Sequence, residues 1–277
     1  MLKNVLVLLG ESPSSAVASA YARRIVKAQD AEITSVSGVD LSFIEAPMPG
    51  TIGGAAYHAQ METGLKAQAK KARRRVAETF ERECAGDGIM PKSISFDGDP
   101  LEQVTVASAT SDLVVTGHDV TFRGTQRERN SDTLNQLLFT TPRPVLVCPD
   151  QLPAVGSVLI AYDGSLPAMR ALQLFVLIGA WTGRRVQVSS VDSDLKTAER
   201  LASEASTYLQ LHGYEVDPRP VGSVEPPAEI IGMLATLGQV ELLVMGAYGH
   251  RGLKEFLFGS TTQSLVGAPK SCIFLYH

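Results

Sequence analysis

A long internal repeat constrains the fold more than any other feature of this sequence. In the second half of the chain, short apolar runs alternate with stretches of helical periodicity, and these runs are residues 157–162, 186–191, 214–221, 241–245 and 272–276. The first half repeats this order with runs at residues 5–9, 33–39, 112–117 and 144–148. Strands that alternate with helices form parallel sheets with helices on both faces. The sequence therefore predicts two tandem Rossmann- or flavodoxin-like α/β domains, each with a five-stranded, mostly parallel sheet.

The two repeats meet in a segment rich in proline and glycine, residues 149–156, which is typical of a linker. We therefore expect one domain over residues 1–150 and another over residues 154–277. The first repeat carries an insertion around residues 41–64. Its prolines and glycines predict a surface loop, and they are Pro47, Pro49, Gly50, Gly53 and Gly54. A lid, a partner-binding element and a loop without a role all stay open for it.

Composition and charge exclude several classes of protein. Apolar residues make up 44% of the chain and charged residues 19%, a globular composition. The formal net charge of −4 predicts no nucleic-acid partner, because no basic excess is present to neutralise phosphates. No apolar run reaches membrane-spanning length, so no membrane partner is expected. The three cysteines form no paired motif and predict a cytoplasmic protein, and the singly scattered histidines predict no metal site.

One loop of the second half has the residues that phosphate binding requires. The strand at residues 241–245 is followed by Gly246 and Gly249 and then, after nine intervening residues, by Gly259 and Ser260. Glycines allow backbone amides to approach an anion, and the start of the next helix offers free N–H groups. Asp163 follows the first strand of this half, so we expect it at the same sheet edge, where it can accept from a ribose hydroxyl or an adenine amine.

This spacing of glycines resembles the nucleotide motif of the universal stress protein family, and the strand order resembles that family over nearly the whole chain. The resemblance implies a domain that binds ATP, with or without Mg²⁺, and domains paired through their last strands. A homodimer is also open. Carried over residue by residue, it implies a nucleotide site formed by Ala161, Tyr162, Asp163, Val191, Met245, Gly246, Gly249, His250, Gly259, Ser260, Thr261 and Thr262.

The first half departs from this motif. Gly10 stands in place of Asp163, and Val120 stands in place of the second glycine. Asp119 and Asp132 add negative charge beside the corresponding phosphate position, which opposes an anion there. The sequence therefore predicts a degenerate first domain and one nucleotide site per chain, in the C-terminal domain.

Several functions remain open at this point. No Walker lysine motif occurs, and His118 has no nucleophile partner in the sequence, so we predict no catalytic residue, although slow ATP hydrolysis stays open. The leading hypothesis is an ATP-binding protein with a regulatory role in stress response. The alternatives are a nucleotide-using ligase or adenylyltransferase, for which the expected signatures are missing, and a carrier of a small ligand or lipid.

Overall fold

The computed structural model describes residues 1–46, 55–124, 132–247 and 260–277. The first half contains β1 (Asn4–Leu8), α1 (Pro13–Gln29), β2 (Glu32–Asp40), α2 (Leu41–Ile44), α3 (Ala55–Gly86), β3 (Lys92–Gly98), α4 (Pro100–Ser108), β4 (Leu113–Gly117), α5 (Asp132–Thr140) and β5 (Val145–Cys148). The second half contains β6 (Ser157–Ala161), α6 (Leu166–Ile178), β7 (Val186–Asp192), α7 (Leu195–Leu211), β8 (Val216–Gly222), α8 (Pro227–Leu237), β9 (Val240–Gly246), α9 (Ser260–Gly267) and β10 (Cys272–Tyr276).

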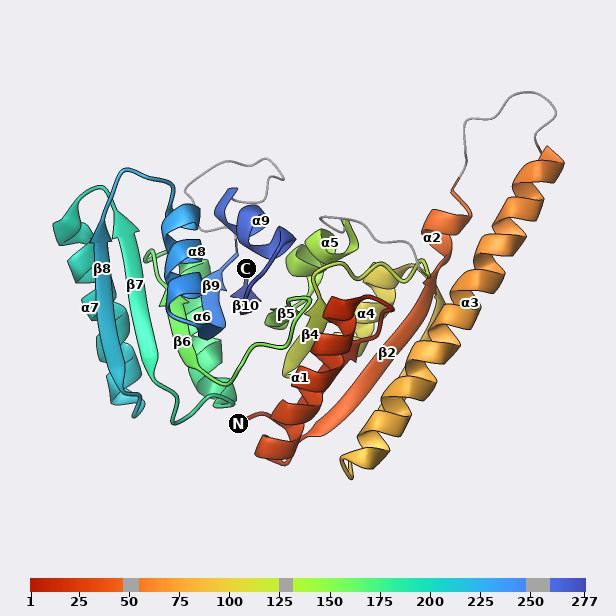
Figure 1. The fold of residues 1–277 in the computed structure, drawn as a ribbon, viewed down its shortest axis with the longest axis horizontal. Helices are drawn as coiled ribbons and strands as arrows, with labels where there is room; N and C mark the ends of the chain where they lie inside the picture. The colour runs from red at the N-terminus through yellow and green to blue at the C-terminus, as the bar shows by residue number, and fades with distance from the viewer. Residues whose placement is uncertain (47–54, 125–131, 248–259) are drawn as a thin grey trace.

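The strands of both halves form one continuous sheet (Figure 1). Its order is β3-β2-β1-β4-β5-β10-β9-β6-β7-β8, so each half has the order 3-2-1-4-5 of Rossmann-like folds. In the described sheet, neighbouring strands are parallel within each half and antiparallel where β5 meets β10. The predicted fold class, a mostly parallel α/β protein, is confirmed.

Helices cover both faces of the sheet. One apolar layer contains residues of α1, α3, α6 and α7, and the other contains residues of α4, α5, α8 and α9. Each layer runs across both halves without a break, since Leu146 and Phe274 belong to the first and Val147 and Ile273 to the second. Within the described residues, no helix combines the length and the apolar character needed to cross a membrane.

The helices that follow the first strand of each half begin in the same way. Ser12 precedes Pro13, and its hydroxyl accepts from the backbone N–H of Ser15 at 3.2 Å. Ser165 caps α6 likewise, with its hydroxyl accepting from Ala168 N at 3.3 Å. Such caps satisfy free N–H groups at a helix start, and proline in the first turn loses no hydrogen bond there. The repeat therefore extends to single residues at the carboxyl ends of β1 and β6.

The two halves meet along β5 and β10, with Ile273 opposite Val147. At the amino end of β9, the buried carboxylate of Glu241 accepts from Tyr21 Oη at 2.9 Å and pairs with Arg24 Nη2 at 2.6 Å. The backbone N–H of Gly156 donates to the same carboxylate at 2.9 Å. Because Tyr21 and Arg24 lie on α1, Glu241 joins the halves through charged and polar contacts as well as through the sheet.

The insertion of the first half differs from the loop that the sequence predicted. Residues 41–44 form the short helix α2, and residues 55–64 belong to α3, which has 32 residues where the corresponding α7 has 17. The prolines and glycines behind the loop prediction fall at residues 47–54, outside the described residues. From residue 55 onward the sequence is rich in alanine, glutamine, glutamate and lysine, which have high helix propensity, and this explains the extended helix.

Candidate functional site

A large cavity opens at the carboxyl edge of the second half, where ligands of α/β sheets bind. Its volume is about 1000 Å³, which is large enough for a nucleotide. The ends of β6, β7 and β9 and the first turns of α6 and α8 contribute its walls. Thr262 of α9 also lines it and is buried.

The floor of this cavity is a row of side chains on three neighbouring strands. Ala161 on β6 lies opposite Met245 on β9 and opposite Ser189 on β7. Partners in a parallel sheet point to the same face, so these three side chains lie at one level. Val191 lies two residues beyond Ser189 on that same face, and Ile231 of α8 also lines the cavity. The floor is therefore largely apolar, with Ser189 as a hydroxyl-bearing member.

The rim carries negative charge. Asp163, Asp192 and Glu225 line the cavity, and the described lining contains no lysine, arginine or histidine. Asp163 Oδ1 accepts from the backbone N–H of Ser165 at 2.9 Å, and Asp192 Oδ1 accepts from that of Asp194 at 2.8 Å. These bonds fix both carboxylates at the ends of their strands.

Tyr162 lies between the cavity and the α7 layer. Burial raises the pKa of its phenol above the ordinary value of 10.0, and the carboxylates of Glu204 and Asp163 add to this effect. The phenol therefore stays protonated at neutral pH and offers a neutral group beside the cavity.

Seven residues that the sequence predicted for the nucleotide site line this cavity, namely Ala161, Tyr162, Asp163, Val191, Met245, Gly246 and Thr262. Gly249, His250 and Gly259 lie outside the described residues. Ser260 begins α9, and Thr261 follows it in the first turn, but their side chains also lie outside the description. Sequence reasoning missed Ser189, Asp192 and Glu225. Ser189 could have been found from its position two residues before Val191 on one face of a strand.

Gly246 has a packing role that the phosphate argument did not include. A Cβ at this position would lie 2.5 Å from Ala168 N and 2.7 Å from the carbonyl carbon of Pro167, both in the first turn of α6. Gly117 holds the same place in the first half, where a Cβ would lie 2.7 Å from Ser15 N of α1. The end of the fourth strand therefore packs against a helix backbone in both halves, whether or not a ligand binds.

In the first half, protein atoms fill most of the corresponding place. The cavity there has about 180 Å³. A Cβ on Gly38 would overlap the ring of Phe96, so that ring lies directly on the β2 backbone. Phe122 packs edge-on against Phe96 with ring centroids 5.2 Å apart, and its carbonyl accepts from Asp40 N at 3.0 Å. The loop after β4 thus lies in the first-half site.

The strand registers correct one equivalence between the halves. The apolar runs at residues 33–39 and 186–191 end on Val39 and Val191, and from the sequence we predict that these two residues are equivalent. In the structure, Val36 lies opposite Leu8 as Ser189 lies opposite Ala161, so Gly38 holds the place of Val191. The aromatic ring of Phe96 therefore covers the position that corresponds to Val191, a residue that the resemblance places in the nucleotide site.

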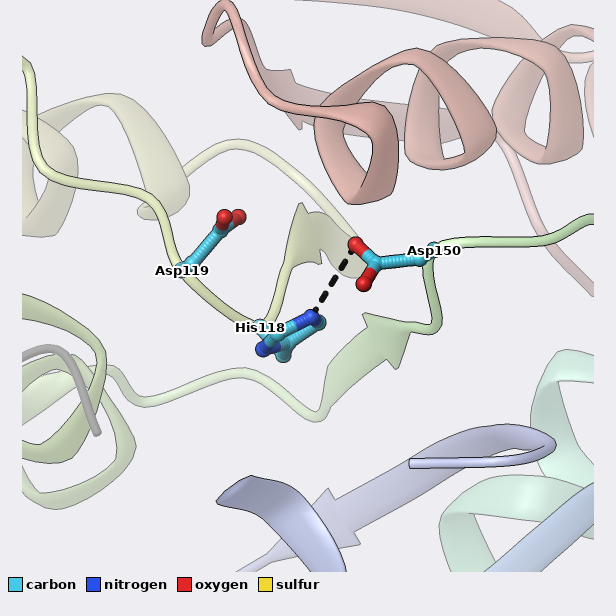
Figure 2. Close-up of side chains that lie close together, drawn as sticks. All are labelled: His118, Asp119 and Asp150. Carbon is cyan, nitrogen blue, oxygen red and sulfur yellow. Dashed lines mark hydrogen bonds and ion pairs between the residues drawn. The ribbon is translucent and has the colours of Figure 1, made fainter. Parts of the chain in front are cut away.

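A polar group formed by His118, Asp119 and Asp150 lies just beyond the carboxyl ends of β4 and β5 (Figure 2). His118 Nε2 lies 3.2 Å from Asp150 Oδ1, and buried Asp119 accepts from Ser14 Oγ. Among the described residues, this is the one group of histidine, cysteine, aspartate and glutamate side chains with three ligand atoms close together, within 4.8 Å of one another. Because both His118 and Asp119 already have protein partners, we assign no metal ion to it.

In the described residues, these features define an α/β protein of two similar halves, with a large cavity at the carboxyl edge of the second half and a much smaller one at that of the first. The model of the Universal stress protein family matches residues 155–273. Universal stress protein Slr1230 from Synechocystis sp. (strain ATCC 27184 / PCC 6803 / Kazusa) is 28% identical over 142 residues, which cover 48% of this chain and 46% of that relative. The chain thus aligns with about half the length of this relative.

Solved structures share the fold over both halves. A universal stress protein from Archaeoglobus fulgidus DSM 4304 has a TM-score of 0.72 and 18% identity, covering 99% of this chain and 97% of that one. A Pseudomonas aeruginosa UCBPP-PA14 protein assigned to the same family has a TM-score of 0.64 and 16% identity, covering 99% and 93%. The C-terminal half of the chain thus matches the Universal stress protein family model, and the solved structures share the fold of this chain across both halves.

Proposed function

We propose that the second half binds ATP in the large carboxyl-edge cavity and that the chain acts as an ATP-responsive regulatory protein in stress response. The observation that carries this proposal is the contrast between the two halves. A cavity of about 1000 Å³ is present in one half, whereas about 180 Å³ is left in the other. The proposed site is therefore single.

The residues of the cavity fit a nucleotide by their chemistry. Ala161, Val191 and Met245 offer an apolar surface for the base, and Asp163 offers an acceptor for a ribose hydroxyl. The phosphates would lie toward the start of α9, because a helix N-terminus attracts anions and the acidic rim repels them. ATP, when bound, supplies a polyphosphate whose presence or cleavage changes the charge of this edge.

Titration calorimetry of the whole chain with ATP and Mg²⁺ tests the stoichiometry. We expect one site per chain. Two equivalent sites would contradict the proposed asymmetry, and no binding would remove ATP as the ligand. Native mass spectrometry of the purified protein distinguishes ATP binding from a carrier function. A bound adenine nucleotide would support ATP binding, and a different bound adduct would support a carrier.

The variant Gly249→Val tests the loop directly. If this glycine lets phosphate approach the backbone, valine should abolish ATP binding and leave the melting temperature nearly unchanged, because the added methyl groups occupy the anion's space. Val120 stands at the matching place of the first half, which indicates that the scaffold tolerates valine. A lower melting temperature with retained ATP affinity would instead assign Gly249 to turn formation alone.

A further inference from the structure

The floor of the large cavity contains a buried hydroxyl that the fold itself does not use. Ser189 is 0% exposed, and its Oγ has no hydrogen-bond partner in the part of the chain that the structure describes. Leaving a buried polar group unpaired costs about 1–3 kcal/mol. Its place among the residues that line the cavity makes a bound ligand the natural partner.

The surroundings of Ser189 indicate what kind of ligand this is. Its neighbours at the same level are Ala161 and, beyond it, Met245, with Val191 above on the same strand face. The small side chain of Ala161 leaves room in the cavity above β6, the strand between β9 and β7. An apolar floor with a single hydroxyl at one side suits a flat heteroaromatic ring that presents a polar atom at its edge.

The first half provides an internal comparison. The register places Val36 where the second half has Ser189, and Leu8 where it has Ala161. Both Leu8 and Val36 are fully buried in an apolar layer, and the site above them is filled by Phe96 and Phe122. The same scaffold therefore accepts an apolar residue at this position when no cavity lies above it, so Ser189 is not required for folding.

Ser190, the next residue along β7, is buried like Ser189 but lies on the other face of the strand. Ser190 is 1% exposed and its Oγ likewise has no partner among the described residues. Successive side chains of a strand point to opposite faces, and Ser190 points with Val186 and Val188 into the α6 and α7 layer. It does not line the cavity. Ser190 is thus a matched control for any effect of removing a buried hydroxyl from β7.

We propose that Ser189 is a specificity-determining residue whose hydroxyl hydrogen-bonds the edge of the purine ring of the bound nucleotide, an inference that rests on the proposed function. A serine hydroxyl both donates and accepts, so it can pair with either kind of ring atom. A ligand that presents an apolar edge there leaves the hydroxyl unpaired and binds less tightly, which is how a polar pocket discriminates.

The experiment uses the full chain and the variants Ser189→Ala and Ser190→Ala, with ATP as the probe. We expect Ser189→Ala to weaken ATP binding about three- to tenfold, the usual value of one hydrogen bond, and Ser190→Ala to leave it unchanged. In the absence of nucleotide, neither variant should lower the melting temperature, because neither hydroxyl has a partner among the residues that the structure describes. A set of ATP analogues, each lacking one hydrogen-bonding group of the purine ring, completes the test.

One of these analogues should bind wild type more weakly than ATP does, yet bind Ser189→Ala and wild type equally. Equal ATP affinity of Ser189→Ala and wild type would overturn the inference while leaving ATP binding intact. Equal losses for Ser189→Ala and Ser190→Ala, or a loss of Ser189→Ala stability without nucleotide, would overturn it by assigning the effect to the fold. Failure of wild type to bind ATP would overturn the proposed function and this inference together.

Discussion

At the scale of single residues, Gly246 and Gly117 show that a motif glycine can be required by packing. Each ends the fourth strand of its half where the first turn of a helix leaves no space for a Cβ. One glycine of the pattern that predicts a nucleotide loop is therefore also required by the packing of the fourth strand against a helix backbone. Within this glycine motif, the argument for phosphate binding therefore depends on Gly249 and the residues after it.

Replacing Gly246 by alanine should lower the free energy of unfolding by about 1–3 kcal/mol, because a Cβ at 2.5 Å from the α6 backbone forces one of the two elements to move. Chemical denaturation of the full chain measures this loss. Gly64→Ala is the matched control, since Gly64 lies in α3 with nothing within 4 Å of an added Cβ. Alanine should stabilise that helix slightly. Equal effects of the two substitutions would contradict the packing role of Gly246.

Most of the site could be predicted at this scale because strand ends and glycines are visible in the sequence. Asp163 follows from its position at the end of a strand, whereas Val191 was implied by the family resemblance. Ser189 was missed because its place in the cavity lining depends on which face of β7 borders the cavity, and the sequence does not show this face. Val39 was matched with Val191 in place of Gly38, because the apolar runs do not specify the register, and a shift of one residue along a strand is decided by the register.

At the scale of elements, α3 is the largest departure from the sequence prediction. It is held against α1 by ion pairs at its C-terminal end, where Arg23 contacts Glu83 and Asp87. It is also held over the first-half site, where Arg73 pairs with Asp97 and Arg75 pairs with Glu11. A helix of this length was hidden from sequence reading, because the prolines and glycines before residue 55 dominated the interpretation.

The contact of α3 with α1 should weaken in acid. The hydrogen bond from Arg23 lowers the pKa of Asp87 below its ordinary value of 3.8. A carboxylate with a lowered folded-state pKa adds stability above its ordinary pKa and loses it as the pH falls through the folded-state value. The melting temperature should therefore fall below about pH 4, and this fall should be smaller in Arg23→Gln.

Arg74→Gln is the control for this measurement. Arg74 pairs with Glu78 on the surface of the same helix, and its side chain is 82% exposed against 15% for Arg23. Exposed pairs of this kind add little to stability, so the acid response of Arg74→Gln should follow wild type. An Arg23→Gln curve that also follows wild type would show that the Arg23 contacts have no part in acid unfolding.

At the scale of the whole molecule, the two halves share one sheet and two apolar layers. The apolar end strands were visible in the sequence as edges that need covering. Their antiparallel register, with Phe274 opposite Leu146, was not visible, because it depends on how two domains meet. The network around Glu241 was not visible either, since a glutamate at the start of a strand gives no sign of burial in sequence.

A chain of residues 154–277 alone should self-associate, because β10 would lose β5 and expose an apolar edge. Size-exclusion chromatography with light scattering measures this, with the full chain as the control in which the same edge is covered by β5. The truncated chain also loses Tyr21 and Arg24 as partners of buried Glu241, so it should unfold at lower temperature. A stable, monomeric product would contradict both expectations.

The seam between β5 and β10 also sets an order of events during synthesis. Cys148 and Cys272, whose sulfurs lie 3.8 Å apart across it, are separated by 124 residues of chain. At about 5–20 residues per second, the ribosome takes on the order of ten seconds to make the intervening segment. During that interval β1 to β5 of the first half have been synthesised, but the edge of β5 that pairs with β10 has no partner. Chaperones that shield such edges have their longest opportunity to act on this protein at that stage.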